Sequence, residues 1–136
     1  MLSRELKEQF GDIDIYLFDQ LLKGRFDQRP RVLDAGCGEG RNLVYLLQRG
    51  VACYGVDSDA RSIERVRSLA ARLASSLPAG NFQLAEVDRM PWPDASMDVV
   101  MASALLHFSR DAGHFTAMVN EMWRVLAPGG LFFARL

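Results

Sequence analysis

The 136-residue sequence is poor in cysteine, has almost no net charge and contains no long apolar run. Its two cysteines, Cys37 and Cys53, match neither the spacing of a zinc site nor that of a redox pair, so we expect no metal and a reduced cytoplasmic setting. A net charge of −1 gives no general attraction to nucleic acid. No apolar stretch reaches membrane-spanning length, and the amphipathic segment 1–10 does not resemble a signal peptide, so we expect no membrane partner.

The overall composition is typical of a globular domain, with 49% hydrophobic and 24% charged residues. The chain is long enough to build one hydrophobic core, and it shows no internal repeat, low-complexity segment or linker. We therefore expect a single domain over residues 1–136. Within it, residues 1–28 are expected to form an N-terminal helical cap, and residues 29–136 the core sheet and its helices.

The N-terminal region shows helical spacing of apolar residues in two pieces that separate near Gly11. In the second piece, Asp12 is a candidate N-cap and Gly24 a candidate stop. This second helix is apolar on more than one face. Two interpretations are open: the helix packs on the sheet, or its additional apolar face covers a ligand pocket.

After residue 30, short apolar runs alternate with helical patterns. Strands are expected at 31–37, 51–57, 81–88, 98–103 and 131–136. Helices are expected at 41–50, 59–76 and 111–127, the last ended by Pro128, Gly129 and Gly130. This alternation with short connections predicts an α/β domain whose doubly wound, mostly parallel sheet has about five strands and flanking helices.

Polar residues cluster where these strands end. Asp57 and Asp88 each close a predicted strand, Asp34 lies beside the glycines at the end of the first, and the segment 103–107 lies at the end of the fourth. Because ligands of doubly wound sheets bind outside the carboxyl ends of the strands, the sequence predicts one binding site there.

The segment "VLDAGCGEGRN" is the glycine-rich turn after the first strand, with Gly36, Gly38 and Gly40 at alternate positions. The dinucleotide fingerprint needs its third glycine where Arg41 stands, so this pattern fails. The adjacent Asp34 would repel a pyrophosphate, but it would favour a ligand that carries an ammonium and a sulfonium. The turn therefore favours a cationic cofactor over a diphosphate.

Asp57 follows Gly38 by 19 positions, at the end of the second strand. A carboxylate there suits two ribose hydroxyls as a bidentate acceptor. Asp57 would suit the ribose of a dinucleotide and that of a cationic cofactor equally, so it does not discriminate between the two.

Four segments, "VLDAGCGEGRN", "YGVDSD", "AEVDRMPWPDASMDVVMASALLHF" and "EMWRVLAPGGLFF", carry a family resemblance. In order and spacing they resemble the motifs of class I S-adenosylmethionine-dependent methyltransferases, especially the methyltransferase type 11 group. The resemblance runs from about Arg31 to the C-terminus. It implies a Rossmann-like fold, S-adenosylmethionine as cofactor, S-adenosylhomocysteine as product, and methyl transfer by in-line displacement.

The resemblance also implies which residues contact the cofactor. Asp34 and the backbone of Gly36 and Gly38 lie against its methionine part, and the Ser103 carbonyl accepts from the methionine amino group. Asp57 accepts from the ribose hydroxyls. Ser58 lies beside the adenine, and Asp88 accepts from the adenine amino group. Arg89 and Met90 are placed beside the adenine ring. The full set comprises Asp34, Gly36, Cys37, Gly38, Asn42, Asp57, Ser58, Asp88, Arg89, Met90 and Ser103.

His107 is the histidine expected near the transferred methyl, either for proton transfer or acceptor contact, or as a structural loop residue. His114 opens a helix and is expected to face solvent. The segment "ASALLHF" lacks the acidic or amide residue followed by Pro-Pro-aromatic that related enzymes use on nucleic-acid bases and glutamine, and no Pro-Cys nucleophile is present. A small-molecule acceptor is therefore favoured. The alternatives are a non-catalytic cofactor-binding module or a truncated fragment and, more weakly, a dehydrogenase.

Domains of this family usually continue for two further strands, whereas this sequence ends inside the fifth. The segment 131–136 should then be an aggregation-prone edge unless something covers it. Three explanations are open: a shortened piece of a longer protein, a naturally short form, or self-association through the fifth strand.

Overall fold

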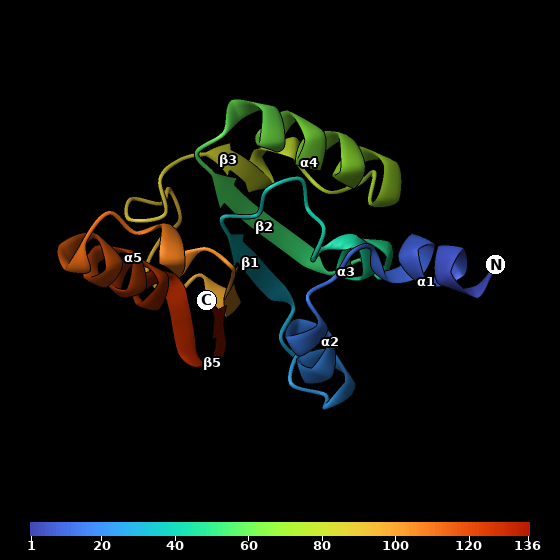
Figure 1. The fold of residues 1–136 in the computed structure, drawn as a ribbon, viewed down its shortest axis with the longest axis horizontal. Coiled ribbons are helices and arrows are strands. Elements are labelled where there is room, and N and C mark those ends of the chain that lie inside the picture. The colour runs from blue at the N-terminus through green and yellow to red at the C-terminus, as the bar shows by residue number, and fades with distance from the viewer.

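A computed structural model describes all 136 residues as a parallel sheet flanked by helices (Figure 1). The strands are β1 (Arg31–Ala35), β2 (Ala52–Asp57), β3 (Phe82–Leu84), β4 (Met97–Ser103) and β5 (Leu126–Arg135), in the order β3-β2-β1-β4-β5. The helices are α1 (Leu2–Phe10), α2 (Ile15–Leu22), α3 (Val44–Gln48), α4 (Ala60–Leu73) and α5 (Ala112–Val125), with 3₁₀ turns η1 (Ala79–Asn81) and η2 (Leu106–Phe108). Every strand pair is parallel, so the predicted doubly wound α/β fold is confirmed.

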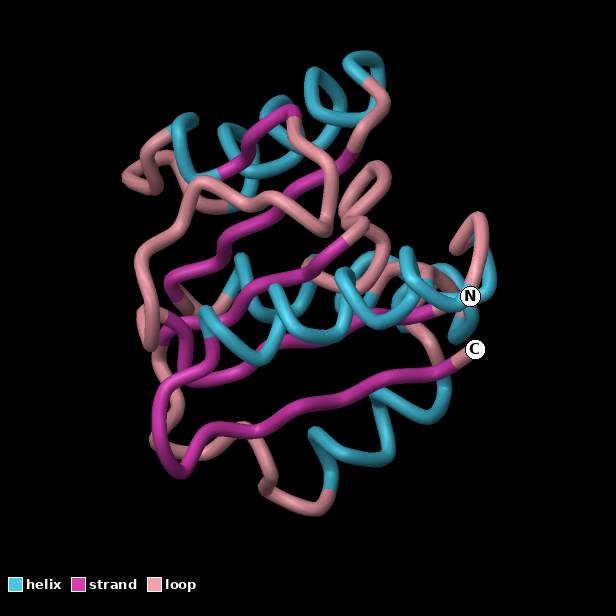
Figure 2. Tube along the Cα trace, turned by 90° about the vertical axis from the view of Figure 1, so that its left-hand side faces the viewer, coloured by secondary structure: helices cyan, strands magenta, loops and turns pink.

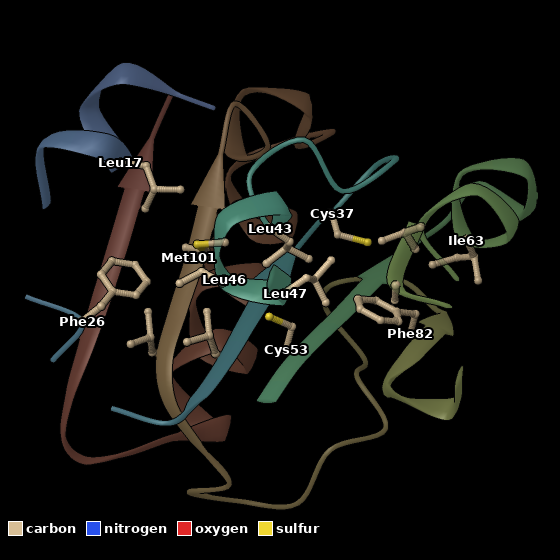
Figure 3. Packing of buried hydrophobic residues seen from close by; sticks show 14 residues of the cluster. Leu17, Phe26, Cys37, Leu43, Leu46, Leu47, Cys53, Ile63, Phe82 and Met101 are labelled. Carbon is tan, nitrogen blue, oxygen red and sulfur yellow. The ribbon is translucent and has the colours of Figure 1, made fainter. Parts of the chain in front are cut away.

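The strands run between layers of helices (Figure 2), and a separate apolar cluster fills each side of the sheet. Alternate residues of β1 point to opposite faces, as the two-residue period of a strand requires. Val32 joins the cluster that α3 and α4 cover, shown in Figure 3, whereas Leu33 joins the cluster beneath α5. Both clusters are fully buried at these positions, which holds the carboxyl end of β1 in a fixed place.

The central strand β1 pairs with β2 on one side and with β4 on the other. Asp34 stands opposite Gly55 of β2 and Met101 of β4. The strand order reverses at β1, because the chain fills one half of the sheet through β2 and β3 and the other through β4 and β5. This reversal is the position at which doubly wound sheets bind ligands.

The N-terminal helices break at Gly11 and stop before Gly24, as predicted; both glycines have positive φ, 68° and 74°. The predicted N-cap of α2 is wrong. Asp14, not Asp12, caps the helix, and its carboxylate accepts hydrogen bonds from the backbone N–H groups of Tyr16 and Leu17. A carboxylate at this position satisfies N–H groups that have no partner inside the helix.

Three predicted boundaries differ from the structure. Helix α5 ends at Val125 and not at the Pro-Gly-Gly segment, because Leu126 already pairs with Met97 of β4. The segment 127–130 then forms an irregularity in β5 before Leu131 pairs with Val99. Strand β3 stops at Leu84, and α3 begins only at Val44. No helix of the chain has both the length and the apolar character needed to cross a membrane.

Candidate active site at the carboxyl ends of the strands

A cavity of about 220 Å³ opens where β1 and β2 end. Its walls come from the glycine turn, the end of β2, the segment after β3, the η2 turn and the start of α5. The lining residues are Gly36, Asp57, Ser58, Ala85, Glu86, Val87, Leu105, Phe108, Arg110, His114 and Met118. Elements far apart in sequence therefore meet at the edge of the sheet where the ligand was predicted.

At two of its three glycines the turn packs so closely against neighbouring side chains that a Cβ would not fit. Gly36 has a φ of 69°, and a Cβ there would lie 2.7 Å from Leu105. A Cβ on Gly40, whose φ is 91°, would lie 2.8 Å from Val66 of α4. Gly38 also has a positive φ, but the space beside it is open. The turn thus packs against protein at two glycines and presents open backbone at the third.

Asp57 holds this turn in place. Its carboxylate accepts a hydrogen bond from the Gly38 N–H and another from the Asp59 N–H, each at 2.9 Å. Each oxygen keeps a further acceptor position, so the half-buried carboxylate lining the cavity remains able to accept from two ligand hydroxyls. Asp57 therefore has a structural role that the sequence did not reveal, beside its predicted ribose role.

Asp34 lies at the end of β1, close to the turn, and only 2% of its surface is exposed. The pKa of its carboxyl is raised to about 7, mainly by burial; the Arg41 guanidinium opposes this rise, and the Asp57 carboxylate adds to it. No hydrogen bond contributes to this pKa. The central strand thus ends in a desolvated acid without a hydrogen-bonded partner, an arrangement that a nearby cation would stabilise.

Cys37 is buried, and its sulfur lies where a Cβ on Gly55 would approach it to 2.8 Å. Burial raises the pKa of the Cys37 thiol and raises that of Cys53 to about 12. Both thiols point into the cluster of Figure 3 and stay protonated near neutral pH, so neither is a nucleophile.

After β3, the structure brings Glu86 and its two neighbours to the cavity rather than the predicted trio that begins at Asp88. Met90 is buried in the cluster beneath α5, where Glu121 accepts from its N–H and Arg124 donates to its carbonyl. Arg89 is exposed and does not line the cavity. Asp88 does not line the cavity either, but its Oδ2 lies 3.8 Å from Nε2 of His114, which does.

Asn42 and Ser103 belong to a network around Asp14 and do not line the cavity. The Asn42 side chain accepts a hydrogen bond from the Asp14 N–H, and the Ser103 hydroxyl donates to the Asp14 carboxylate. Arg135, at the end of β5, donates to the same carboxylate, and Arg41 donates to Ser103. Burial raises the pKa of Asp14, but the hydrogen bonds from Ser103 and Arg135 outweigh it and hold the pKa below its ordinary value.

The two histidines differ from each other in placement. His107 is exposed on η2 and stacks at a tilt against Phe108, with ring centroids 4.1 Å apart; it does not line the cavity. The expectation that His114 faces solvent is wrong: its side chain is 11% exposed and forms part of the cavity wall. The cavity side of α5 could not be recognised from helical spacing, because His114 lies within its polar first turn.

Seven further lining residues were not predicted, namely Ala85, Glu86, Val87, Leu105, Phe108, Arg110 and Met118. The available signal was their position just after the strands β3 and β4, or in the helix that follows. No group of three or more histidine, cysteine or acidic side chains is placed to hold a metal ion. The glycine turn and the acids at the ends of β1 and β2 together form a ligand site at the switch point of a doubly wound sheet, and the buried Asp34 favours a cationic ligand there.

Comparison with known proteins agrees with this class. The family model of the methyltransferase domain matches residues 33–134. The chain belongs to this family, the class I S-adenosylmethionine-dependent methyltransferases, and the predicted cofactor is thereby confirmed.

Three curated relatives cover most of this chain. A probable S-adenosylmethionine-dependent methyltransferase of Mycolicibacterium smegmatis is 38% identical over 74% of this chain and 35% of its own. The 27-O-demethylrifamycin SV methyltransferase of Amycolatopsis mediterranei is 34% identical over 74% of this chain and 36% of its own. The tRNA 5-carboxymethoxyuridine methyltransferase of Escherichia coli is 28% identical over 83% and 42%. The chain thus spans less than half the length of each relative.

A solved structure of a Pyrococcus horikoshii protein shares the fold. It superposes with a TM-score of 0.71 at 26% identity, over 88% of this chain and 56% of the other.

Proposed function

We propose that this chain binds S-adenosylmethionine in the cavity beside β1 and β2 and supports transfer of its methyl group to a small-molecule acceptor. The observation that carries the proposal is the convergence of Gly36 and Asp57 on one cavity, with the buried Asp34 carboxylate at the adjoining strand end. Asp57 then accepts from the ribose hydroxyls, Ser58 lies beside the adenine, and the glycine turn lies along the methionine part.

The charge of Asp34 serves binding more than the chemical step. Methyl transfer neutralises the sulfonium, so a fixed negative charge beside the sulfur would stabilise the ground state more than the transition state. We therefore place the Asp34 carboxylate toward the cofactor ammonium, whose charge persists throughout the reaction. Alignment of acceptor and methyl then supplies the acceleration, on the order of 7–11 kcal/mol for well-oriented reactants.

The acceptor class rests on charge and on the relatives. A net charge of −1 gives the chain no broad attraction to a phosphate polymer. One relative's name specifies a rifamycin, a small molecule, whereas another's specifies a tRNA nucleoside. We therefore favour a small-molecule acceptor. Methylation of tRNA in its place would contradict this choice.

The test incubates the chain with S-adenosylmethionine and separate acceptor panels of phenols, amines, carboxylic acids and unmodified tRNA, and follows release of S-adenosylhomocysteine. Release with a small molecule supports the proposal, and release with tRNA alone contradicts the acceptor class. Cofactor binding without release in any panel would favour the second candidate, a binding module without catalysis. Binding of NAD in place of S-adenosylmethionine would contradict the proposal as a whole.

His107 remains our candidate for contact with the acceptor or its proton. It is exposed beside Phe108, which lines the cavity, so its imidazole can reach a molecule at the cavity mouth. His107→Gln should lower kcat while cofactor affinity stays unchanged. An unchanged kcat would leave His107 a loop residue.

We also propose that β5 can pair with a second copy of the chain. It is the last strand in the sheet order, so its outer edge has no strand partner. Sedimentation across a concentration series tests this, and a monomer at all concentrations would contradict it.

A further inference from the structure

Two arginines meet at the carboxyl ends of β4 and β5. Ser103 and Arg135 stand opposite each other in the sheet, and the Ser103 hydroxyl and the Arg135 guanidinium both donate to Oδ2 of Asp14. Arg41, which follows the glycine turn, donates to the same Ser103 hydroxyl at 3.3 Å. One hydroxyl and one carboxylate oxygen therefore link the two guanidinium groups.

This cluster of Arg41, Arg135, Ser103 and Asp14 carries an excess of positive charge. The Asp14 carboxylate is 1% exposed and already accepts four hydrogen bonds, two of them from backbone N–H groups of α2. A carboxylate has about four acceptor positions, so Asp14 cannot also accept from Arg41. Arg41 donates only to the Asp12 carbonyl and the Ser103 hydroxyl, which are neutral, and it forms no ion pair.

One further acid senses the charge of Arg41. The Arg41 guanidinium lowers the pKa of Asp34, whose surface is 2% exposed. The proposed function assigns the Asp34 carboxylate to the cofactor ammonium, so this acid does not neutralise the cluster when the cofactor is bound. An anion from outside the chain would supply the missing charge.

Both guanidinium groups keep donors for such an anion. Nε of Arg41 and Nη2 of Arg135 donate to no protein atom, and Nη1 of Arg135 reaches only the Leu136 carbonyl, at 3.4 Å. Arg41 is exposed, and the Arg135 side chain is 37% exposed. The Arg135 guanidinium also lies 5.6 Å from the ring centre of Tyr16, which is 62% exposed. An aromatic surface therefore adjoins the free donors, which suits an anion attached to an apolar body.

The cluster adjoins the cofactor cavity without lining it. Leu105 and Phe108 follow Ser103 within five positions, and both line the cavity. Between them and β4, the Ala104 N–H donates to the Arg135 carbonyl. The segment after β4 thus runs from the cluster to the cavity wall, and a molecule held by the cluster lies beside the cavity.

We propose that Arg41 and Arg135 form an anion subsite, which binds a carboxylate of the methyl acceptor while Tyr16 contacts the acceptor's apolar body. The inference rests on the proposed function and narrows its acceptor class to small molecules that carry a carboxylate. One excess positive charge matches a monoanion, and each guanidinium can donate to one carboxylate oxygen. An amide of the same shape has no charge and turns N–H donors toward the arginines.

The test measures binding of benzoate and benzamide by calorimetry at constant ionic strength, to the chain alone and to the chain saturated with S-adenosylhomocysteine. Arg41→Gln removes the charge but keeps an amide donor for Ser103. Arg41→Lys keeps the charge and serves as the rescue variant. Arg61→Gln, at an exposed position of α4, is the matched control.

Benzoate should bind about tenfold more tightly than benzamide, the effect of hydrogen bonds to a charged group, and equally well with or without S-adenosylhomocysteine. Arg41→Gln should weaken benzoate binding about fivefold, as expected for a solvent-exposed charge, without weakening the binding of S-adenosylhomocysteine. Arg41→Lys should restore part of the benzoate affinity, and Arg61→Gln should match the wild type.

Absent or equal binding of benzoate and benzamide, or an unchanged benzoate affinity in Arg41→Gln, would overturn the inference. Competition between benzoate and S-adenosylhomocysteine would also overturn it, because the arginines would then hold the carboxylate of the cofactor itself. A chain that does not bind S-adenosylhomocysteine at all would instead contradict the proposed function.

Discussion

Replacing Asp34 with asparagine should stabilise the protein and weaken cofactor binding at the same time. Burial raises the pKa of this carboxyl from 3.8 to about 7, so above pH 7 the folded protein carries an ionised group that it disfavours. A shift of this size corresponds to about 4 kcal/mol lost from stability at high pH. The amide removes the charge but leaves a buried polar group that costs about 1–3 kcal/mol, so the net gain is about 1–3 kcal/mol.

The sign of the pH dependence follows from the same shift. Because the folded-state pKa is raised, the penalty is absent below the unfolded value of 3.8 and complete above about 7. Asp34→Asn should therefore gain stability over the wild type as pH rises from 4 to 8. Affinity for a cationic cofactor should follow the ionised form of Asp34, so the wild-type Kd should rise about 50-fold from pH 7 to pH 5.

Urea unfolding at several pH values and calorimetry with S-adenosylmethionine measure the two effects separately. The variant should unfold at higher urea at pH 8 and show a much flatter pH dependence of Kd than the wild type. A variant that is less stable at pH 8, or that binds with the wild-type affinity and slope, would refute the reasoning.

Further predictions concern stability alone. Asp14→Ala removes an N-cap and one half of an ion pair whose carboxylate is 1% exposed, and urea unfolding should show a loss of about 2–4 kcal/mol, since the partner is partly solvated. An unchanged midpoint would contradict it. Gly40→Ala should cost about 1–3 kcal/mol more than Gly50→Ala, because both have positive φ but only Gly40 meets neighbouring side chains within 3 Å. Equal losses would show that packing is irrelevant there.

Most elements of the fold could be predicted from the sequence, because local sequence patterns determine where these helices and strands form. Glycine positions, apolar periods and helix spacing define β1, β2, α4 and the two N-terminal helices, and parallel pairing follows from the alternation. The end of α5 was wrong, because the pairing of Leu126 with Met97 depends on a strand 29 positions earlier in the chain. Tertiary pairing overrode the stop expected from the Pro-Gly-Gly segment.

The candidate site was predictable at strand ends and less so elsewhere. Asp57 reaches the cavity because its strand directs it there, and Asp34 is buried because β1 is central. Asn42 and Ser103 turn toward Asp14, at sequence separations of 28 and 89 residues. Such distant contacts leave no periodic signal, and the same holds for the placement of His114.

The most direct measurement is a thermal-shift titration of the wild-type chain with S-adenosylmethionine, S-adenosylhomocysteine and NAD. The two adenosyl ligands should raise the midpoint progressively, with about 2.7 kcal/mol of stabilisation at 100 times Kd, and NAD should leave it unchanged. Stabilisation by NAD, with no response to either adenosyl ligand, would show that the end of β1 does not select a cation.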